Sequence, residues 1–435
     1  MRTYWWASPG WVTLLLMTPI SLIVYVMPKQ AYVEFDQARQ FFAGDQLLAA
    51  LAGLLAFSAG CGIVGYVSRS AQRRTVGQTA GPTTRLMHAH YRRVMLAIGL
   101  VALAGNIAVI LPILADPGLI FAFLSGETSV FYLLKERTLQ VPGLTSVSNL
   151  AALFATLYAL KLKIAERRLD WFDHGFAAVV FSAVLMRAVF NSERLAIIEV
   201  VLPIGIVWFG TVGTRWRAWL SFAPILGIVG IIVLFGVTEY FRSWTVYRYY
   251  YDDYTDFVLS RIWGYYLTAL NNGAGLAELY PPTFDGTYTM NWFYRFPLFP
   301  WVASDSEPTF WEYAFQYAKA EFNNTSGIFA PMHDFGPVFG ILMWFVLGVL
   351  SGRIYEGYRQ GKFQYMIIHP TWMIGVYEIL RFFYWGSSKY FPTLIVTMVI
   401  IVFMARHRAV ATAPIVNRRA HPLAPITIRG GRGRP

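Results

Sequence analysis

The sequence predicts an all-α, polytopic integral membrane protein, and three observations support this fold class. Hydrophobic residues make up 56% of the 435 residues, charged residues only 14%, and the mean hydropathy is +0.46. Apolar windows of the length that a bilayer-crossing helix needs recur along the chain. Lysine and arginine gather in alternate loops. Soluble domains carry about 25% charged residues, so a soluble globular class is excluded.

Ten apolar windows are predicted to be transmembrane helices. They are centred on residues 11–27, 46–67, 94–114, 144–162, 172–190, 195–211, 218–237, 330–352, 365–384 and 390–405. The first follows Arg2 and has no small-residue cleavage site before Pro28, so we interpret it as a retained span. Residues 117–130 are too short to span, and we expect them to be re-entrant or extracellular.

The distribution of basic residues predicts the orientation. Most of the 36 fall on one side of the predicted bundle, at Arg2, 69–93, 161–168, Arg215, Arg217, 353–362 and from Arg406 onward. Cytoplasmic loops carry this excess, so both termini are predicted to be cytoplasmic. The net charge of +12 follows from this bias and from a basic tail suited to anionic membrane lipids. No nucleic-acid-reading motif accompanies it, so no nucleic-acid partner is expected.

The chain divides into four predicted regions. Residues 1–237 hold the first seven spans, 238–329 a large outer loop, 330–405 the last three spans and 406–435 the basic tail. The loop is rich in aromatic residues, as in "SWTVYRYYYDDYTDF" and "MNWFYRFPLFPW", which predicts a folded cap rather than disorder. Within it, residues 256–276 are apolar but interrupted by Arg261, Asn271 and Asn272, which predicts an amphipathic interfacial helix.

Charges near the outer ends of the spans are the candidate functional residues, because ionisable groups at membrane depth are costly. Arg187 lies one turn inside the fifth window and Arg194 begins the sixth, so a hairpin brings them to similar depth, with Glu193 able to pair with either. An anion site is the favoured interpretation, and a structural ion pair that locks the hairpin is the alternative. Guanidinium groups bind phosphate in a bidentate manner. Further outer arginines are Arg242, Arg248, Arg261, Arg295 and Arg381, the last with a local pairing alternative to Glu378.

His333 and Asp334 begin the eighth window, beside Gly336 and Gly340, which would permit close helix approach. A histidine next to an aspartate is a candidate general base or phosphate donor, and an interfacial histidine that serves packing is the alternative. Motifs for zinc, nucleotide or serine-hydrolase chemistry are missing, and the single Cys61 allows no internal disulfide.

Two motifs resemble the O-antigen and exopolysaccharide repeat-unit polymerases of the Wzy type. They are "NSERLAII", at the start of a central span, and "FAPMHDFGPVFGILMWFVLGVLSGRIYEG", which follows the large outer loop; an R-x10-G pattern runs from Arg194 to Gly205. The resemblance covers roughly residues 187–358, together with the span count and the cytoplasmic termini. It implies a GT-C-like membrane glycosyltransferase of the bacterial inner membrane that builds cell-envelope polysaccharide on the periplasmic side.

The implied reaction transfers a growing glycan from undecaprenyl diphosphate to a hydroxyl of the incoming lipid-linked repeat unit. Such a transfer needs a cationic clamp for the leaving diphosphate and a group that activates the acceptor. The clamp candidates are Arg187, Arg194, Arg242, Arg248 and Arg381, with Arg261 also facing the substrate. His333, Asp334 and Glu193 are the acceptor-side candidates, and Trp244, Tyr249 and Trp292 are candidates for stacking on sugar rings. The resemblance implies no cofactor or metal, and it allows a chain-length regulator as partner.

Three alternatives stay open. An O-antigen ligase would use the same chemistry. A glycosyltransferase that uses polyprenyl-phosphate sugars is suggested by Glu34 and Asp36, which form an E-x-D pair in the first outer loop. A lipid-linked oligosaccharide flippase belongs to a different class, and the lack of a whole-chain internal repeat argues against transporters built from duplicated halves.

Overall fold

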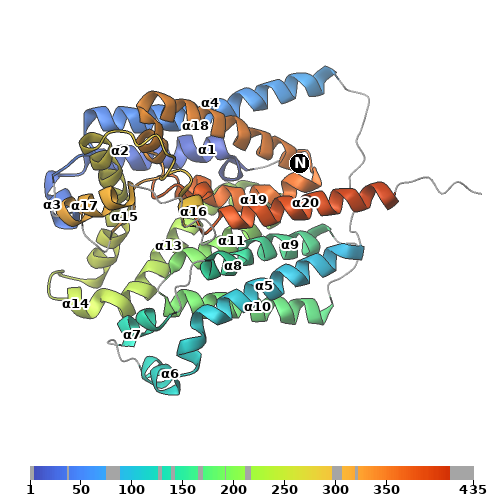
Figure 1. Cartoon of the computed structure of the whole chain (residues 1–435), viewed down its shortest axis with the longest axis horizontal. Helices are drawn as coiled ribbons and strands as arrows, with labels where there is room; N and C mark the ends of the chain where they lie inside the picture. The colour runs from blue at the N-terminus through green and yellow to red at the C-terminus, as the bar shows by residue number, and fades with distance from the viewer. Residues whose placement is uncertain are drawn as a thin grey trace, which may run out of the picture.

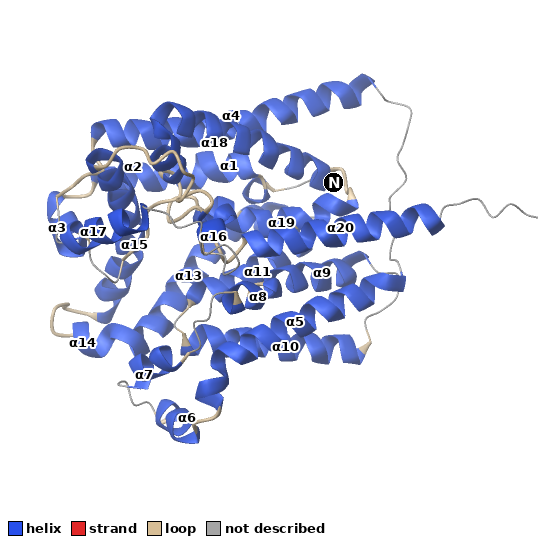
Figure 2. Ribbon diagram, viewed as in Figure 1, coloured by secondary structure: helices blue, strands red, loops and turns tan. Residues whose placement is uncertain are grey.

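The computed structural model describes residues 4–36, 39–74, 89–125, 130–138, 143–164, 170–191, 193–210, 217–295, 306–318 and 322–411. Within these ranges the regular structure is helical, with no strand (Figure 2). Five helical segments are long and apolar enough to cross a membrane: Pro9–Val26, Gly44–Ser70, His90–Leu114, Trp171–Phe190 and Ala330–Arg359. The prediction of an all-helical membrane protein is therefore confirmed at this level.

The first half of the chain supplies most of the long helices. Trp5–Ala7 is a short 3-10 turn (η1), and the first window is α1 (Pro9–Val12), a π-helical turn η2 (Thr13–Met17) and α2 (Thr18–Val26). Next come α3 (Lys29–Asp36), α4 (Gly44–Arg74), α5 (Ala89–Leu114), α6 (Pro117–Leu124), α7 (Val130–Arg137), α8 (Leu144–Ser148) and α9 (Leu150–Ile164). They are followed by α10 (Trp171–Phe190), α11 (Arg194–Phe209), α12 (Arg217–Ser221) and α13 (Ala223–Glu239). The window at 144–162 is thus broken into α8 and α9.

The large loop is helical as well. It contains η5 (Tyr240–Trp244), α14 (Thr245–Tyr247), α15 (Tyr254–Leu279), α16 (Asn291–Tyr294) and α17 (Ser306–Tyr317). The last part of the chain forms α18 (Ala330–Arg359), α19 (Phe363–Glu378), the 3-10 turn η6 (Tyr384–Gly386) and α20 (Phe391–Ala411). The window at 365–384 therefore ends early, at Glu378.

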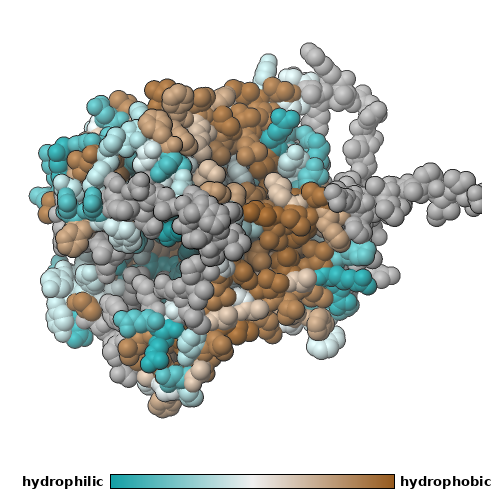
Figure 3. Space-filling model, in the orientation of Figure 1, coloured by the Kyte–Doolittle hydropathy of each residue, from teal (hydrophilic) through white to brown (hydrophobic). Residues whose placement is uncertain are grey.

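The two ends of the bundle differ in what they carry. The N-terminus, the last turns of α4, α9 and α20 and the first turns of α5 and α10 lie at one end, the right in Figure 1, which we call the tail end. The short helices α3, α6, α7, α14 and α17 lie at the other, which we call the cap end. Hydrophobic residues gather over the middle of the face in Figure 3, and hydrophilic residues lie toward both ends. A hydrophobic middle between hydrophilic ends is the pattern expected of a surface that lies in a bilayer.

Glycines set the closest helix contact, between α4 and α18. A Cβ added to Gly60 would lie 2.4 Å from the carbonyl oxygen of Phe345, and one added to Gly348 would lie 2.1 Å from that of Phe57. Cys61, on the same face of α4, donates to the carbonyl oxygen of Gly348 at 3.1 Å. In lipid, such close backbone approach replaces the hydrophobic effect as a source of helix association.

Helix α18 is kinked at Gly336, which has φ +78° and ψ 166°. Only glycine adopts this φ readily, and the following Pro337 favours the extended ψ. The kink separates one helical turn, which carries His333 and Asp334, from the long membrane-type helix. Gly336 therefore acts through its backbone conformation, while Gly340 lets the turn pack closely, since a Cβ there would lie 2.7 Å from Met332.

Helix α15 places its polar interruptions inside the protein. Asn271 accepts hydrogen bonds from the backbone N–H groups of Phe41 and Phe42 at 2.7 and 2.9 Å. Asn272 donates to the carbonyl oxygens of Phe322 and Asn324 at 2.9 and 3.1 Å. These contacts hold the cap helices to the segment between α3 and α4 and to the segment that leads into α18.

Candidate functional site

A cavity of about 780 Å³ opens between the cap helices and the ends of α11, α19 and α20. Among the residues that line it are four cations, Arg194, Arg295, Arg381 and Lys389, and one carboxylate, Glu193. Eight aromatic residues are among the described residues that line it: Phe235, Tyr265, Tyr288, Tyr294, Phe310, Trp311, Phe382 and Phe383. Leu195, Ile198 and Phe235 form an apolar part of the wall. The cavity thus combines positive charge, flat rings and an apolar surface from α11 and α13.

Arg194 begins α11 and connects three helices. Its guanidinium pairs with the buried carboxylate of Glu239 at the end of α13 and donates to Thr238 at 2.8 Å. It also lies over the ring of Phe235, 3.9 Å from the centroid. Arg261 of α15 reaches the same carboxylate at 3.5 Å. Glu239 therefore compensates two buried arginines, of which only Arg194 lines the cavity.

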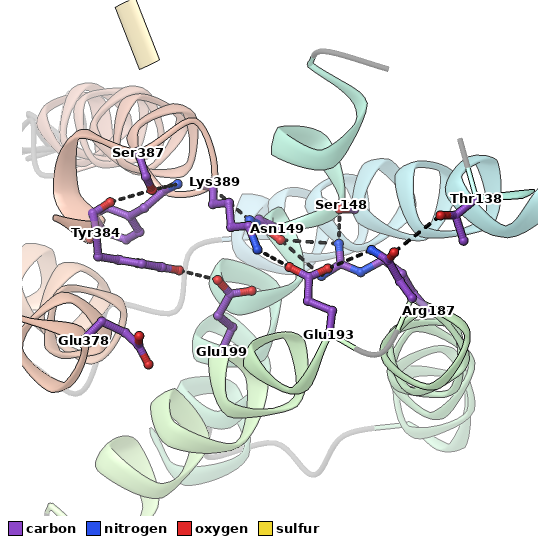
Figure 4. Close-up of polar contacts among 12 residues, drawn as sticks. Thr138, Ser148, Asn149, Arg187, Glu193, Glu199, Glu378, Tyr384, Ser387 and Lys389 are labelled. Carbon is purple, nitrogen blue, oxygen red and sulfur yellow. Dashed lines mark hydrogen bonds and ion pairs between the residues drawn. The ribbon is translucent and has the colours of Figure 1, made fainter. Parts of the chain in front are cut away.

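Arg187 lies behind the cavity wall, in the last turn of α10, and is 3% exposed. It donates to the hydroxyl of Ser148 and, at 3.3 Å, to the side-chain oxygen of Asn149. It also lies 3.5 Å from Glu193, whose other oxygen pairs with Lys389. Figure 4 shows the three charged side chains in a row, Arg187 to Glu193 to Lys389, with Glu193 in the middle. Arg187 and Glu193 are thus part of one network that runs from α8 to the turn before α20, whereas Arg194 pairs with Glu239 instead.

The electrostatics of this network keep Glu193 ionised. Burial opposes its charge, but the positive charges of Lys389 and Arg187 and hydrogen bonds from Lys389 and Asn191 prevail, and they lower the pKa of Glu193 to about 2. Burial also opposes the charge of Lys389, but the neighbouring carboxylates of Glu193 and Glu199 raise the pKa of its amine. A carboxylate with so low a pKa is a weak proton acceptor near neutral pH, so a pairing function fits Glu193 better than the general-base role.

Two further charged groups approach the site. Arg381 lines the cavity and pairs with Glu378 at 2.9 Å, as the local alternative predicts, and it lies 5.2 Å from the Tyr265 centroid. Glu199, deeper in α11, accepts a hydrogen bond from the hydroxyl of Tyr384 at 2.7 Å (Figure 4). Arg381 is only partly covered when it pairs with Glu378, so the same side chain also reaches the cavity.

Asp334 anchors a segment that we call the strap, residues 281–290. It is fully buried and accepts hydrogen bonds from the backbone N–H groups of Tyr288 and Thr289 at 3.0 and 2.7 Å, and from the Thr289 hydroxyl at 2.6 Å. The backbone N–H of Phe284, a non-glycine residue at φ +56°, donates to the Asp334 carbonyl oxygen. Asp334 thus positions the strap, and neither it nor His333 lines the cavity. The His333 ring packs against Tyr288, with 4.9 Å between centroids.

The other predicted substrate-binding residues are not among the described residues that line the cavity. Arg248 and Tyr249 are exposed and contact each other, Trp244 packs on Tyr254 and Phe257, and Trp292 packs on Phe391. Arg242 falls in η5, and its side chain lies outside the described part of the structure, as do those of Glu34 and Asp36. Of the predicted residues, Glu193, Arg194, Arg295 and Arg381 are brought together at the cavity.

Four participants were missed by the sequence analysis. Lys389 and Glu239 are single charged residues next to apolar windows, and no motif marks them. Tyr288 and Tyr294 are common residues of the aromatic loop, and only the strap brings them to the cavity wall. The signal available for Lys389 was its charge just before a helix N-terminus, a position that the helix dipole makes unfavourable for a cation.

The fold and this cavity define a helical membrane protein with a cationic, aromatic-lined site at the cap end of its bundle. Within the described residues, no three His, Cys, Asp or Glu side chains gather as metal ligands would. Comparisons of the chain with protein-family models, with curated proteins and with solved structures find no match. The chemistry of the site is therefore the basis for assigning a function.

Proposed function

We propose that the protein is a membrane polysaccharide polymerase that joins oligosaccharide repeat units carried on undecaprenyl diphosphate. The observation that carries the proposal is the composition of the cavity wall. Among the described residues that line the cavity, four cations stand against one carboxylate, and this composition favours an anion such as diphosphate, which would compete with Glu239 and Glu378 behind the wall. Rings of tyrosine, phenylalanine and tryptophan stack on the apolar faces of sugars, and the apolar side of α11 and α13 suits a polyprenyl chain.

The proposed topology has ten spans, with both termini cytoplasmic and the cavity on the periplasmic side of the bacterial inner membrane. Each of the ten apolar windows contains helix, and the shorter helices α9, α11, α13 and α19 alternate in direction with the longer ones. The basic residues Arg92, Lys161, Arg353 and Arg359 lie at the tail end, opposite the cavity. By the positive-inside rule, the tail end is cytoplasmic.

In the proposed reaction, the bond between the anomeric carbon of the donor glycan and its diphosphate oxygen breaks. A hydroxyl oxygen of the acceptor unit forms the new bond to that carbon. The hydroxyl proton passes to the departing diphosphate, because a phosphate group with a second pKa of about 6 is a better acceptor than Glu193, with its pKa of about 2. The cavity cations stabilise the negative charge that develops on the leaving group.

The packing of the N-terminal segment is compatible with an enzyme that works on one side. Tyr4, Trp6 and Ala7 are buried. The indoles of Trp5 and Trp6 donate to the carbonyl oxygens of Ser221 and Leu220 at 3.1 and 2.7 Å. A transferase needs no path to the tail end, whereas an alternating-access carrier would open one in another state. A ligase would use the same cavity and differs only in its acceptor.

The test replaces Arg381 with glutamine in the producing cell and measures the length of surface glycans on a gel. Loss of a cation that contacts diphosphate is expected to leave single repeat units or short chains. The matched control is Arg359→Gln, because Arg359 forms the same i,i+3 pair, with Glu356 at 2.9 Å, at the opposite end of the bundle. With equal membrane levels, unchanged chain lengths in Arg381→Gln would refute the proposal. Surface glycan missing altogether would indicate a flippase.

A further inference from the structure

Lys389 lies in a turn at the cavity wall. It lies two residues before α20, where the positive end of the helix dipole repels a cation. The backbone there is fixed: Ser146 donates to the carbonyl oxygen of Ser388 at 2.5 Å, and Asn149 donates to that of Lys389 at 3.1 Å. The side chain is nevertheless 35% exposed, and it lines the cavity. A rigid turn therefore presents a single accessible amine to the site.

A series of contacts holds the Lys389 amine in position, and it ends at residues in the protein interior. Glu193 accepts from Lys389 through one oxygen and faces Arg187 at 3.5 Å through the other. Arg187 in turn is held by Ser148 and Asn149, and it does not line the cavity. Asn149 binds both Arg187 and the backbone of Lys389, so the contacts form a closed ring (Figure 4).

We infer that Lys389 is a direct ligand of the diphosphate and that Arg187 is a positioning residue that acts on it through Glu193. The inference rests on the proposed function for the identity of the anion, since diphosphate is the group that a polyprenyl-linked donor presents. Arg187 is therefore no longer a candidate for direct contact with the diphosphate; instead, it holds Lys389 in place through Glu193. Lys389 also adds a cation from the turn before α20 to Arg194 and Arg381.

The experiment measures binding of inorganic pyrophosphate to the whole protein in detergent, from the concentration dependence of its thermal unfolding midpoint. Lys389→Gln is expected to weaken the Kd for pyrophosphate about tenfold, as loss of a charge-assisted hydrogen bond does. Lys389→Arg, which keeps the charge, is expected to stay within about threefold of the original. Lys362→Gln is the matched control, because Lys362 is an exposed lysine that also precedes a helix, α19, at the tail end.

A double-mutant cycle separates positioning from general stability. If Arg187 acts through Lys389, Arg187→Gln weakens pyrophosphate binding in the original protein but has little further effect in Lys389→Gln. Arg187→Lys serves in place of Arg187→Gln if the glutamine variant does not fold. Additive effects on the Kd, an unchanged Kd in Lys389→Gln, or no effect of pyrophosphate on the original protein would each overturn the inference.

The two proposals fail in different ways. If pyrophosphate binding depends on Lys389 while glycan lengths are normal in the Arg381 test, the anion site stands and the polymerase assignment falls. If Arg381→Gln shortens glycans while Lys389→Gln binds pyrophosphate normally, the polymerase stands and the role of Lys389 is overturned.

Discussion

The acidic residues at the cap end compensate the positive charges of the site. Glu239, Glu193 and Glu378 each pair with at least one cation of the site. A buried arginine without such a partner would carry a large desolvation cost. The carboxylates therefore let these cations lie at the cap end of the bundle, where a substrate anion would compete with them for the cations.

Glu239 is the carboxylate whose substitution is expected to reduce the stability of the protein most. It is fully buried and serves both Arg194 and Arg261. Glu239→Gln is expected to lower the free energy of unfolding by about 3–5 kcal/mol, because it leaves buried charge uncompensated. The measurement is thermal unfolding in detergent. Glu278→Gln, which breaks an exposed pair with Arg39, is the control and should cost less than about 1 kcal/mol.

Glu193 gives a prediction for pH. Its pKa falls from 4.5 to about 2 on folding, so its ionised form stabilises the folded protein above the unfolded pKa, and this contribution is lost as the pH drops through the folded one. The difference in unfolding midpoint between the original protein and Glu193→Gln should be constant above about pH 5 and shrink from there toward pH 2. A difference that grows on acidification would contradict the pairing with Lys389.

At the scale of elements, the sequence predicts helices better than their interruptions. Apolar windows marked where the long helices other than α15 lie, because length and hydropathy are local properties. The break between α8 and α9, the kink at Gly336 and the strap depend on tertiary contacts such as Asp334 with Thr289. For the same reason the motif at His333 and Asp334 predicted a chemical role, whereas the fold uses Asp334 to hold backbone. Arg194 and Arg381 were found because an arginine within or next to an apolar window is unusual.

The contact between α4 and α18 provides a test of packing. Gly348→Ala is expected to destabilise the protein by about 1–3 kcal/mol, since its Cβ would overlap the backbone of Phe57. Gly65→Ala on α4 is the matched control: a Cβ there meets nothing within 4 Å. Alanine favours helix over glycine by about 1 kcal/mol, so this variant should be neutral or stabilised. Equal effects of the two substitutions on the unfolding midpoint would argue against the close helix approach.

At the scale of the whole molecule, labelling of introduced cysteines tests which side of the membrane each end of the bundle faces. In a Cys61→Ala background, a cysteine at the exposed position Tyr250 should react with a membrane-impermeant maleimide added to spheroplasts. A cysteine at Lys362 should react only after permeabilisation, because the tail end is predicted to be cytoplasmic. The reverse pattern would place the cavity in the cytoplasm and would exclude a periplasmic reaction.

The buried N-terminal residues have a consequence for how the protein is made. His369 lies 2.9 Å from the carbonyl oxygen of Ala7, and the hydroxyl of Tyr377 donates to that of Trp6 at 2.9 Å, across 362 and 371 positions of the chain. At about 5–20 residues per second, the ribosome reaches these partners roughly 20–70 s after it has made the first residues. Until then, the segment around Trp6 has only its contacts with earlier partners, such as the carbonyl oxygens of Ser221 and Leu220. Packing around this segment is therefore completed only when α19 has been made, and a truncation after α18 would leave it with those earlier contacts alone.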